Sequence, residues 1–399
     1  MNNEIYCGYY WLWGILTTNC WGRGEIMNVT CGYSTQKNPF KAVEQATAQI
    51  TDPKMILYFC PYETFEQITE VLNSKYPNCM ICGSSTLVAY HNDMNWDADP
   101  NGIGLTVTAF GDDFDCVVGA IENVGEIGLE DCREVRRKFD EIGVGENTIC
   151  FEMMNYTGME ENALTVLVEA LRGSGVEVVG GCAGHEHDEI ETAISYNGKI
   201  YKNGCVYLFI HSRCGRIDIV RGDICKPTRR EGIATDVDVL NRIVYEFDGI
   251  PAAEALADEL NLSVDELNGK LAGYPIGRYA DNELNIIELA EVTPEHGLRA
   301  YASVYGGIKY KLLERGDYEK RMDEFCTKMK DNSAEVRFGL FVICTSITHF
   351  FLNESWIHNM TKSFDEIVPM YVGMTGWGEQ NELNQLNQSM IAILFEENV

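Results

Sequence analysis

Residues 178–188 have the sequence Val-Val-Gly-Gly-Cys-Ala-Gly-His-Glu-His-Asp. A short apolar run meets three glycines there and is followed by polar side chains. Glycine permits backbone geometry and close approach that other side chains forbid. Two other stretches have the same shape, residues 80–85 (Met-Ile-Cys-Gly-Ser-Ser) and residues 370–379 (Met-Tyr-Val-Gly-Met-Thr-Gly-Trp-Gly-Glu). The recurrence indicates an internal repeat.

Similar signals precede all three stretches. Apolar runs at residues 56–60, 149–154 and 338–344 favour strands, and each is followed by apolar residues at helical spacing. Helix starts are predicted from Thr64 with Gln67, Thr157 with Glu160, and Ser355. The pattern predicts one strand-helix-strand unit used three times. The alternative is chance similarity among ordinary strand-helix-strand segments, because the period is irregular.

Size and charge limit the class of protein. The chain has 399 residues, 45% of them hydrophobic, which is enough for a large core in two domains or one large domain. Its 61 acidic and 31 basic residues give a net charge of -30, spread along the chain. Such a charge repels phosphate backbones and anionic membrane surfaces. We therefore expect neither nucleic acid nor membrane as a partner.

The 15 cysteines lie mostly inside apolar strands, where a free cysteine behaves as a small hydrophobe. This placement favours a reducing cytoplasm over a disulfide framework. Cys79 and Cys82 form a Cys-x-x-Cys pair, but no second pair follows at zinc-site spacing. We predict no metal there.

The first 26 residues differ from the rest. Residues 5–16 are apolar and aromatic but too few to span a bilayer, and no basic region precedes them as in a signal peptide. Residues 21–27 can be encoded by purine-rich codons that end in a methionine, as at a bacterial ribosome-binding site. One hypothesis makes Met27 the start and residues 1–26 a non-native extension; the alternative is an N-terminal strand or loop.

Turn signals and a charged segment predict how the strands and domains are connected. Asn197-Gly198 and Asn203-Gly204 between apolar runs indicate antiparallel hairpins, so the sheets should be mixed. A charged segment, residues 226–232, is predicted to connect two domains. The expected fold is α/β (mixed α+β): two related halves of repeated strand-helix-strand units, with mixed sheets stacked and flanked by helices.

Several segments, in this order along the chain, resemble the FIST family: residues 59–62 (Phe-Cys-Pro-Tyr), 179–184 (Val-Gly-Gly-Cys-Ala-Gly), 203–206 (Asn-Gly-Cys-Val), 245–252 (Tyr-Glu-Phe-Asp-Gly-Ile-Pro-Ala), 373–379 and 386–389 (Leu-Asn-Gln-Ser). The resemblance implies a FIST N-like domain at residues 27–228 and a FIST C-like domain at residues 229–399. It further implies a cytoplasmic sensory protein of bacterial signal transduction that binds an amino acid or related small metabolite.

The chain departs from the family in two respects. No kinase, cyclase or chemotaxis segment is recognisable, so signalling would need a separate protein partner. The family tends toward Cys-x-Gly-Arg where this chain has Cys344-Thr345-Ser346-Ile347.

The residues also allow other kinds of chemistry. Cys344, with His349 and His358 nearby, could serve a cysteine-dependent enzyme, although no activating motif surrounds it. A protein-interaction adaptor without a ligand is the third hypothesis. His185, Glu186, His187 and Asp188 form the densest group of possible metal ligands, but a polar loop has the same pattern. The glycine stretches lack the nucleotide-binding motifs, so no cofactor is expected.

The ligand site is predicted where the third glycine stretch meets the end of its first strand, because ligands favour the carboxyl edge of parallel strands. Trp377 would supply an apolar wall, Glu379 would hold an ammonium, and Arg278 would pair with a carboxylate. The predicted ligand-binding residues are Arg278, Cys344, Gly373, Gly376, Trp377 and Glu379.

Overall fold

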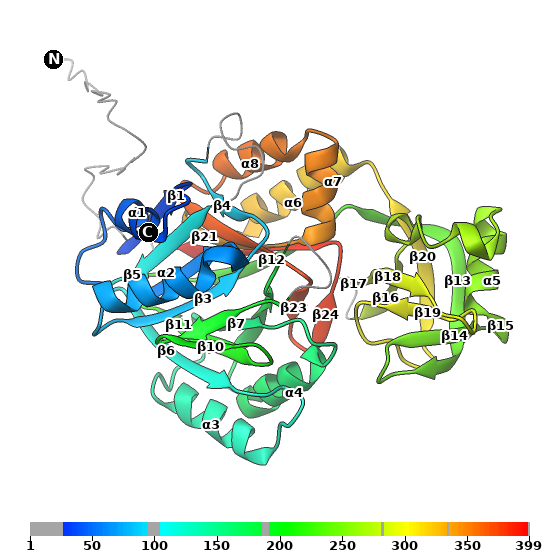
Figure 1. The fold of residues 1–399 in the computed structure, drawn as a ribbon, viewed down its shortest axis with the longest axis horizontal. Coiled ribbons are helices and arrows are strands. Elements are labelled where there is room, and N and C mark those ends of the chain that lie inside the picture. Colours follow the sequence, from blue (N-terminus) through cyan, green and yellow to red (C-terminus); the bar gives the residue numbers. More distant parts are fainter. Residues whose placement is uncertain (1–26, 95–103, 186–190, 281–282, 333–334, 398–399) are drawn as a thin grey trace.

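The computed structural model describes residues 27–94, 104–185, 191–280, 283–332 and 335–397 (Figure 1). Helices and strands alternate along much of the chain, and the sheets contain both parallel and antiparallel pairs. The mixed α/β class is therefore confirmed. The predictions for residues 1–26 fall outside the described residues. None of the described helices is long and apolar enough to span a membrane.

The three predicted strand-helix-strand units are present. In each one the two strands pair in parallel across a helical connection. The apolar strands are buried on both faces, which parallel strands require. The units are β2 (Met55–Cys60), α2 (Tyr62–Lys75) and β3 (Met80–Ser85); β7 (Thr148–Met154), α4 (Glu160–Leu171) and β8 (Glu177–Cys182); and β21 (Val336–Cys344), α7 (Thr345–Asn353), α8 (Ile357–Asp365) and β22 (Tyr371–Gly376).

None of the three predicted helix starts coincides with the observed N-cap, although the second and third lie within two residues of it. In the second unit Glu160 accepts the backbone N–H groups of Thr157 and Gly158 at the start of α4. In the first unit α2 already begins after Pro61, whose φ of -59° suits a helix start, so Thr64 lies inside the helix. Ser355 has a φ of 56° and lies in the turn before α8, whose N-cap is Trp356.

The units form three sheets of the same strand order. The orders are β1 (Val29–Ser34), β5 (Leu105–Phe110), β2, β3, β9 (Ile194–Tyr196); β6 (Phe114–Ile121), β11 (Cys205–Ser212), β7, β8, β23 (Glu379–Asn381); and β12 (Ile217–Asp223), β25 (Ser389–Glu396), β21, β22, β4 (Ala89–His91). Two further strands extend the first two sheets, β10 (Lys199–Tyr201) and β24 (Asn384–Leu386).

The last strand of each order is exchanged between units. β4 follows the first unit but pairs with β22 of the third; β9 follows the second unit but pairs with β3; and β23 follows the third but pairs with β8. The repeat therefore closes on itself as three related sheets rather than as two related halves. The exchange also explains why β10 and β11, expected to form a hairpin at Asn203-Gly204, belong to different sheets.

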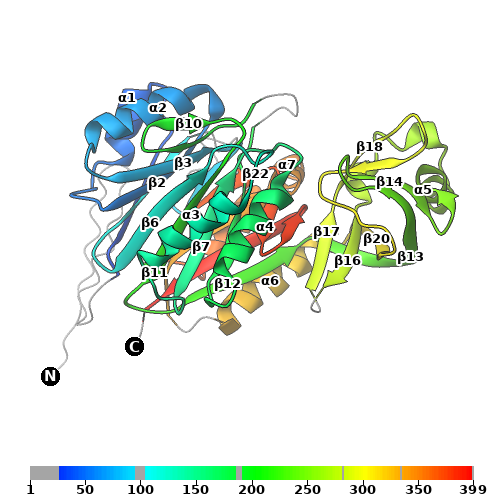
Figure 2. The same ribbon diagram turned by 90° about the horizontal axis from the view of Figure 1, so that it is seen from below.

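The three sheets share one core and carry their helices on the outside (Figures 1 and 2). Leu57, Phe151 and Leu340, one from the first strand of each unit, belong to this core. The opposite faces pack against helices, the first sheet against α1 (Pro39–Ala46) and α2, the second against α3 (Leu129–Asp140) and α4, and the third against α6 (Tyr318–Asn332), α7 and α8.

The three glycine stretches contact one another where the strands end. A Cβ on Gly184 would lie 2.2 Å from the carbonyl oxygen of Thr375, and one on Gly376 would lie 2.4 Å from that of Cys182. The N–H of Gly184 donates to Ser85 O at 2.9 Å. Neither glycine has a positive φ. Glycine is therefore needed there for close approach of three strand ends, and not for a turn.

Residues 225–315, here named the small lobe, form a separate antiparallel sheet beside the remaining residues, named the body (Figure 2). Cys225 pairs with Arg315, so the lobe leaves and rejoins the body at one place. Its elements are β13 (Cys225–Asp238), β14 (Ile243–Phe247), β15 (Ile250–Pro251), α5 (Ala252–Leu260), the short turns η1 (Val264–Glu266) and η2 (Leu271–Gly273), β16 (Ile276–Ala280), β17 (Glu283–Ile287), β18 (Leu289–Val292), β19 (Leu298–Ala300) and β20 (Lys309–Arg315).

The charged segment 226–232 is part of β13 and not a connection. Its charges are paired across the sheet: Lys226 with Glu314, and Glu231 with Lys309 and Lys311. Residues 336–396 belong to the body, because β21 and β22 share a sheet with β12 and β4. The family domains predicted at 27–228 and 229–399 thus differ from the body and the small lobe.

Candidate functional site

A cavity of about 410 Å³ lies between the body and the small lobe, at the carboxyl end of β21. The body contributes the end of β21, one side of α7 and Trp377; the small lobe contributes Glu288, Tyr301 and Arg315. Pockets of this size, lined by apolar side chains and a few polar groups, hold small molecules. The cavity is therefore the candidate ligand site.

Cys344 lies at the junction of strand and helix. It pairs with Gly376 in the parallel ladder, as expected for two strand ends on one edge, and it is the residue before the first turn of α7. Burial, together with the nearby Glu379 and Glu288, raises the pKa of its thiol well above the ordinary value. The thiol is thus protonated at neutral pH, which does not favour a nucleophilic role.

Glu379 lies behind Cys344 and is fully buried. Its Oε2 accepts hydrogen bonds from the hydroxyl and the N–H of Ser389. Burial raises the pKa of this carboxyl well above the ordinary value, although the bonds from Ser389 and from the Cys344 side chain lower it. Burial therefore favours the neutral form of this carboxyl, which offers hydrogen bonds rather than a full charge.

Arg315 supplies a positive charge to the opposite wall. Its guanidinium carbon lies 4.4 Å from the ring centroid of Phe350 on α7, which holds the cation at the cavity. Its Nε is buried and has no hydrogen-bond partner among the described residues. The first turn of α7, with Thr345 and Ser346, lines the same cavity, and a helix N-terminus attracts anions. This side of the cavity suits a carboxylate.

An aromatic group forms another wall and joins the two lobes. Trp377 is stacked on Tyr156 of the body, with ring centroids 6.0 Å apart, and lies 6.4 Å from the ring of Tyr301 in the small lobe. Side chains of this kind bury a large area and orient an apolar part of a ligand.

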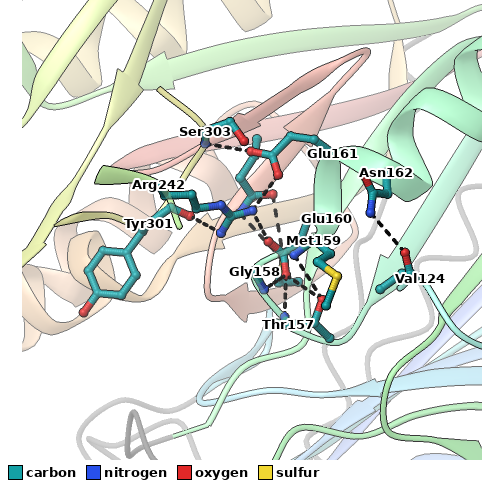
Figure 3. Close-up of polar contacts among 12 residues, drawn as sticks. Val124, Thr157, Gly158, Met159, Glu160, Glu161, Asn162, Arg242, Tyr301 and Ser303 are labelled. Carbon is teal, nitrogen blue, oxygen red and sulfur yellow. Dashed lines mark hydrogen bonds and ion pairs between the residues drawn. The ribbon is translucent and has the colours of Figure 1, made fainter. Parts of the chain in front are cut away.

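A buried ion cluster contacts the backbone carbonyl of Tyr301 (Figure 3). Arg242 of the small lobe is only 4% exposed and pairs with Glu160 and Glu161 of α4 in the body. It also donates to the carbonyl oxygen of Tyr301 at 2.8 Å, while Glu161 accepts the N–H of Ser303 at 2.8 Å. The position of a cavity wall thus depends on a contact between the lobes.

The predicted site residues are placed differently from one another. Cys344 and Trp377 line the cavity, and Gly376 is the ladder partner of Cys344. Gly373 lies within β22 against the backbone of Phe341. Arg278 donates to Asn384 at 3.3 Å and lies over the ring of Tyr305, and it is not among the described residues that line the cavity.

Of the residues that line this cavity, only Cys344 and Trp377 were predicted as ligand-binding from the sequence. Asn387 lies in a segment that resembles the family, and Ser346 lies two residues after Cys344, so the neighbours of both residues indicated them. Arg315 and Glu288 end or follow strands of the small lobe, and no local pattern distinguishes them from surface charges. They reach the cavity only because the lobe folds back onto α7.

No group of three or more His, Cys, Asp or Glu side chains that could hold a metal occurs within the described part of the chain. His185 is buried, with its Nε2 3.1 Å from Glu63 and its ring edge-on to Tyr62. Glu186, His187 and Asp188 lie outside the described residues.

The sequence matches a known protein family. The FIST N domain family matches residues 54–250. The chain contains a FIST N domain. FIST domains are sensory domains of signal transduction, and the match covers most of the first two sheets, β12 and the first strands of the small lobe. Cys344, Trp377 and Arg315 of the FIST protein follow the matched region. No curated protein matches the chain.

Proposed function

We propose that this FIST protein is a cytoplasmic sensor that binds an amino acid or related small metabolite in the cavity between its body and small lobe. The observation behind the proposal is the cavity itself, which both lobes line and which contains Arg315 without an ion-pair partner among the described residues. A ligand there contacts both lobes at once, so binding can alter how they are held together.

The side chains supply complementary chemistry for such a ligand. Its carboxylate pairs with Arg315 and the first turn of α7, as a planar guanidinium and a helix N-terminus both favour. Its ammonium lies on the side of Glu288, whose carboxylate also accepts the hydroxyl of Ser346. Trp377 covers the apolar part, and Cys344 with Glu379 behind it forms the floor.

We further propose that residues 27–228 and 229–399 are the FIST N and FIST C domains, and that a separate signalling protein receives the output. Under this proposal the ligand site is built largely from the second domain, and the buried contact between Arg242 and α4 transmits its state to the first.

A thermal-shift screen against the amino acids tests the proposal. A ligand at roughly 100 times its dissociation constant should add about 2.7 kcal/mol of stability. Arg315→Ala should remove most of this gain, while Arg299→Ala, an exposed arginine of the same lobe, should keep it. Arg278→Ala tests the site predicted from sequence: if it removes the gain and Arg315→Ala does not, the cavity is not the site. If no amino acid stabilises the protein, the proposed ligand class is wrong.

The cysteine-enzyme alternative has its own test. Because the Cys344 thiol is protonated, it is a poor nucleophile and should form no bond to the ligand. Cys344→Ala should therefore keep ligand-induced stabilisation. Turnover of a ligand that this variant abolishes would instead support the enzyme.

A further inference from the structure

The small lobe contains a second cavity, which shares no lining residue with the cavity between the lobes. It has a volume of about 320 Å³ and lies between α5 and the curved sheet. Its floor consists of core side chains that are 6% exposed or less, namely Leu256, Ile276, Leu289, Leu298 and Tyr310. A pocket of this size, with an apolar floor and polar groups at its opening, can hold a small molecule.

The sheet is opened beside this cavity. β13 and β20 pair from Cys225 to Pro227 and again from Glu231, but the ladder shifts between those two positions. The residues of this irregularity end at Arg230, which lines the cavity together with Lys311 of β20. A bulge of this kind separates strands and re-aims side chains next to binding sites. It gives the apolar space a mouth with charged side chains.

The charges at the mouth are unequal. Four acidic residues and two basic residues line it. Arg230 pairs with Glu259, and Lys311 pairs with Glu231. Asp248 and Asp258 make no ion pair among the described residues. Asp248 accepts the N–H of Ile233 at 3.2 Å. The excess of carboxylates over basic groups favours a cation at the rim.

We propose that this cavity is a second ligand site, which takes the apolar body of a small amphiphile and places its ammonium group beside Asp248 and Asp258. The site goes beyond the proposed sensor function, because it needs neither Arg315 nor Cys344. Its occupant is a small aliphatic amine: apolar chain atoms replace the empty space, and the two aspartates replace part of the water around the ammonium.

Calorimetric titration with hexylamine, hexan-1-ol and hexanoate at low ionic strength tests this assignment. Hexylamine should bind most tightly, since only the amine is attracted by the acidic rim. Hexanoate should bind at least about fivefold more weakly than hexylamine. Ala255→Phe, which places a ring in the cavity, should abolish binding of the amine. Ala48→Phe, which adds the same ring at an exposed position of the body, should leave binding unchanged.

A milder pair of variants applies even if the added ring perturbs the lobe. Asp258→Asn should weaken hexylamine binding about threefold without affecting hexan-1-ol, whereas Asp265→Asn, outside the cavity on the same lobe, should affect neither. Three results would overturn the proposal: no binding of hexylamine, equal binding of hexanoate, or loss of hexylamine binding in Arg315→Ala, which would place the amine between the lobes.

Discussion

Glu152, on β7, is a buried carboxyl that the proposed site does not use. It is fully buried, and neither of its carboxyl oxygens has a hydrogen-bond partner among the described residues. Burial, together with the nearby Glu160, raises its pKa from 4.5 to about 8. The side chain is therefore neutral in the folded protein at neutral pH, but ionised in the unfolded chain.

This difference makes stability depend on pH. Between pH about 4.5 and about 8 the folded state holds a proton that the unfolded state has lost, so stability falls as pH rises through this window. The slope for one proton is about 1.4 kcal/mol per pH unit. Glu152→Gln removes the titration, so the free energy of unfolding of the variant relative to the natural chain should rise with pH by that slope.

Urea unfolding of both proteins at pH 5, 6, 7 and 8 measures the difference. The exposed Glu126→Gln serves as control and should differ from the natural chain by the same amount at every pH. A flat difference for Glu152→Gln would mean that Glu152 ionises in the folded protein.

Gly184 provides a prediction about close approach. A Cβ there would lie 2.2 Å from the carbonyl oxygen of Thr375, an atom that cannot move without shifting β22. Gly184→Ala should therefore destabilise the protein by about 1–3 kcal/mol or more. Gly128→Ala, where a Cβ would meet nothing within 4 Å, should stay within about 0.5 kcal/mol. Chemical denaturation compares the two; equal effects would show that the strand ends are not tightly packed.

At the scale of elements, local patterns predicted the strand-helix-strand units well. Apolar runs and helical stripes depend on neighbouring residues, and α2, for example, buries Phe65, Ile68 and Leu72 as its spacing indicates. The exchange of β4, β9 and β23 could not be predicted, because each is a three-residue strand whose partner belongs to another unit. β13 was missed because cross-strand ion pairs, and not apolar alternation, accompany its charged part.

The same distinction applies to the candidate site. Cys344 and Trp377 were predicted because strand ends and glycine stretches mark a sheet edge. Arg315 was not, because it meets α7 only through the return of the small lobe. Arg278 has the right chemistry for a carboxylate, yet its partner is Asn384 at the β24 strand.

The contact between α4 and Arg242 supports a prediction about the joined lobes. Arg242 pairs with Glu160 and Glu161, so its removal leaves the buried Glu160 and the partly buried Glu161 without a counter-charge. Arg242→Met should cost about 3–5 kcal/mol in the free energy of unfolding. Arg137→Met removes an exposed arginine that also pairs with two glutamates and should cost less than about 1 kcal/mol. Urea unfolding at neutral pH measures both; a small effect for Arg242→Met would show that the lobes separate and hydrate the acids at little cost.

For the whole molecule, the arrangement of cores separates the small lobe from the body. Among the described residues, the core shared by the three sheets and the three clusters beneath their helices contain none from 226–314. The small lobe has its own cluster around Val244, Leu256 and Leu298. The N–H of Gly316 donates to Ile224 O at 2.8 Å, so the two ends of the lobe are adjacent. This is the geometry of an inserted domain.

Replacing residues 226–314 by a short Gly-Ser linker should therefore leave a body that unfolds cooperatively. Glu160 and Glu161 would lose Arg242, but they would also become exposed to water, so the penalty of the Arg242→Met variant should not appear. The denaturant dependence of the unfolding free energy should fall, since less surface is exposed on unfolding. Ligand-induced stabilisation should vanish, because Glu288 and Tyr301 are removed and Arg315 loses its strand. Circular dichroism during urea unfolding, with and without the ligand found by the amino-acid screen, distinguishes the outcomes: loss of the cooperative transition would show that the body depends on the lobe, and retained stabilisation by ligand would show that binding does not take place between them.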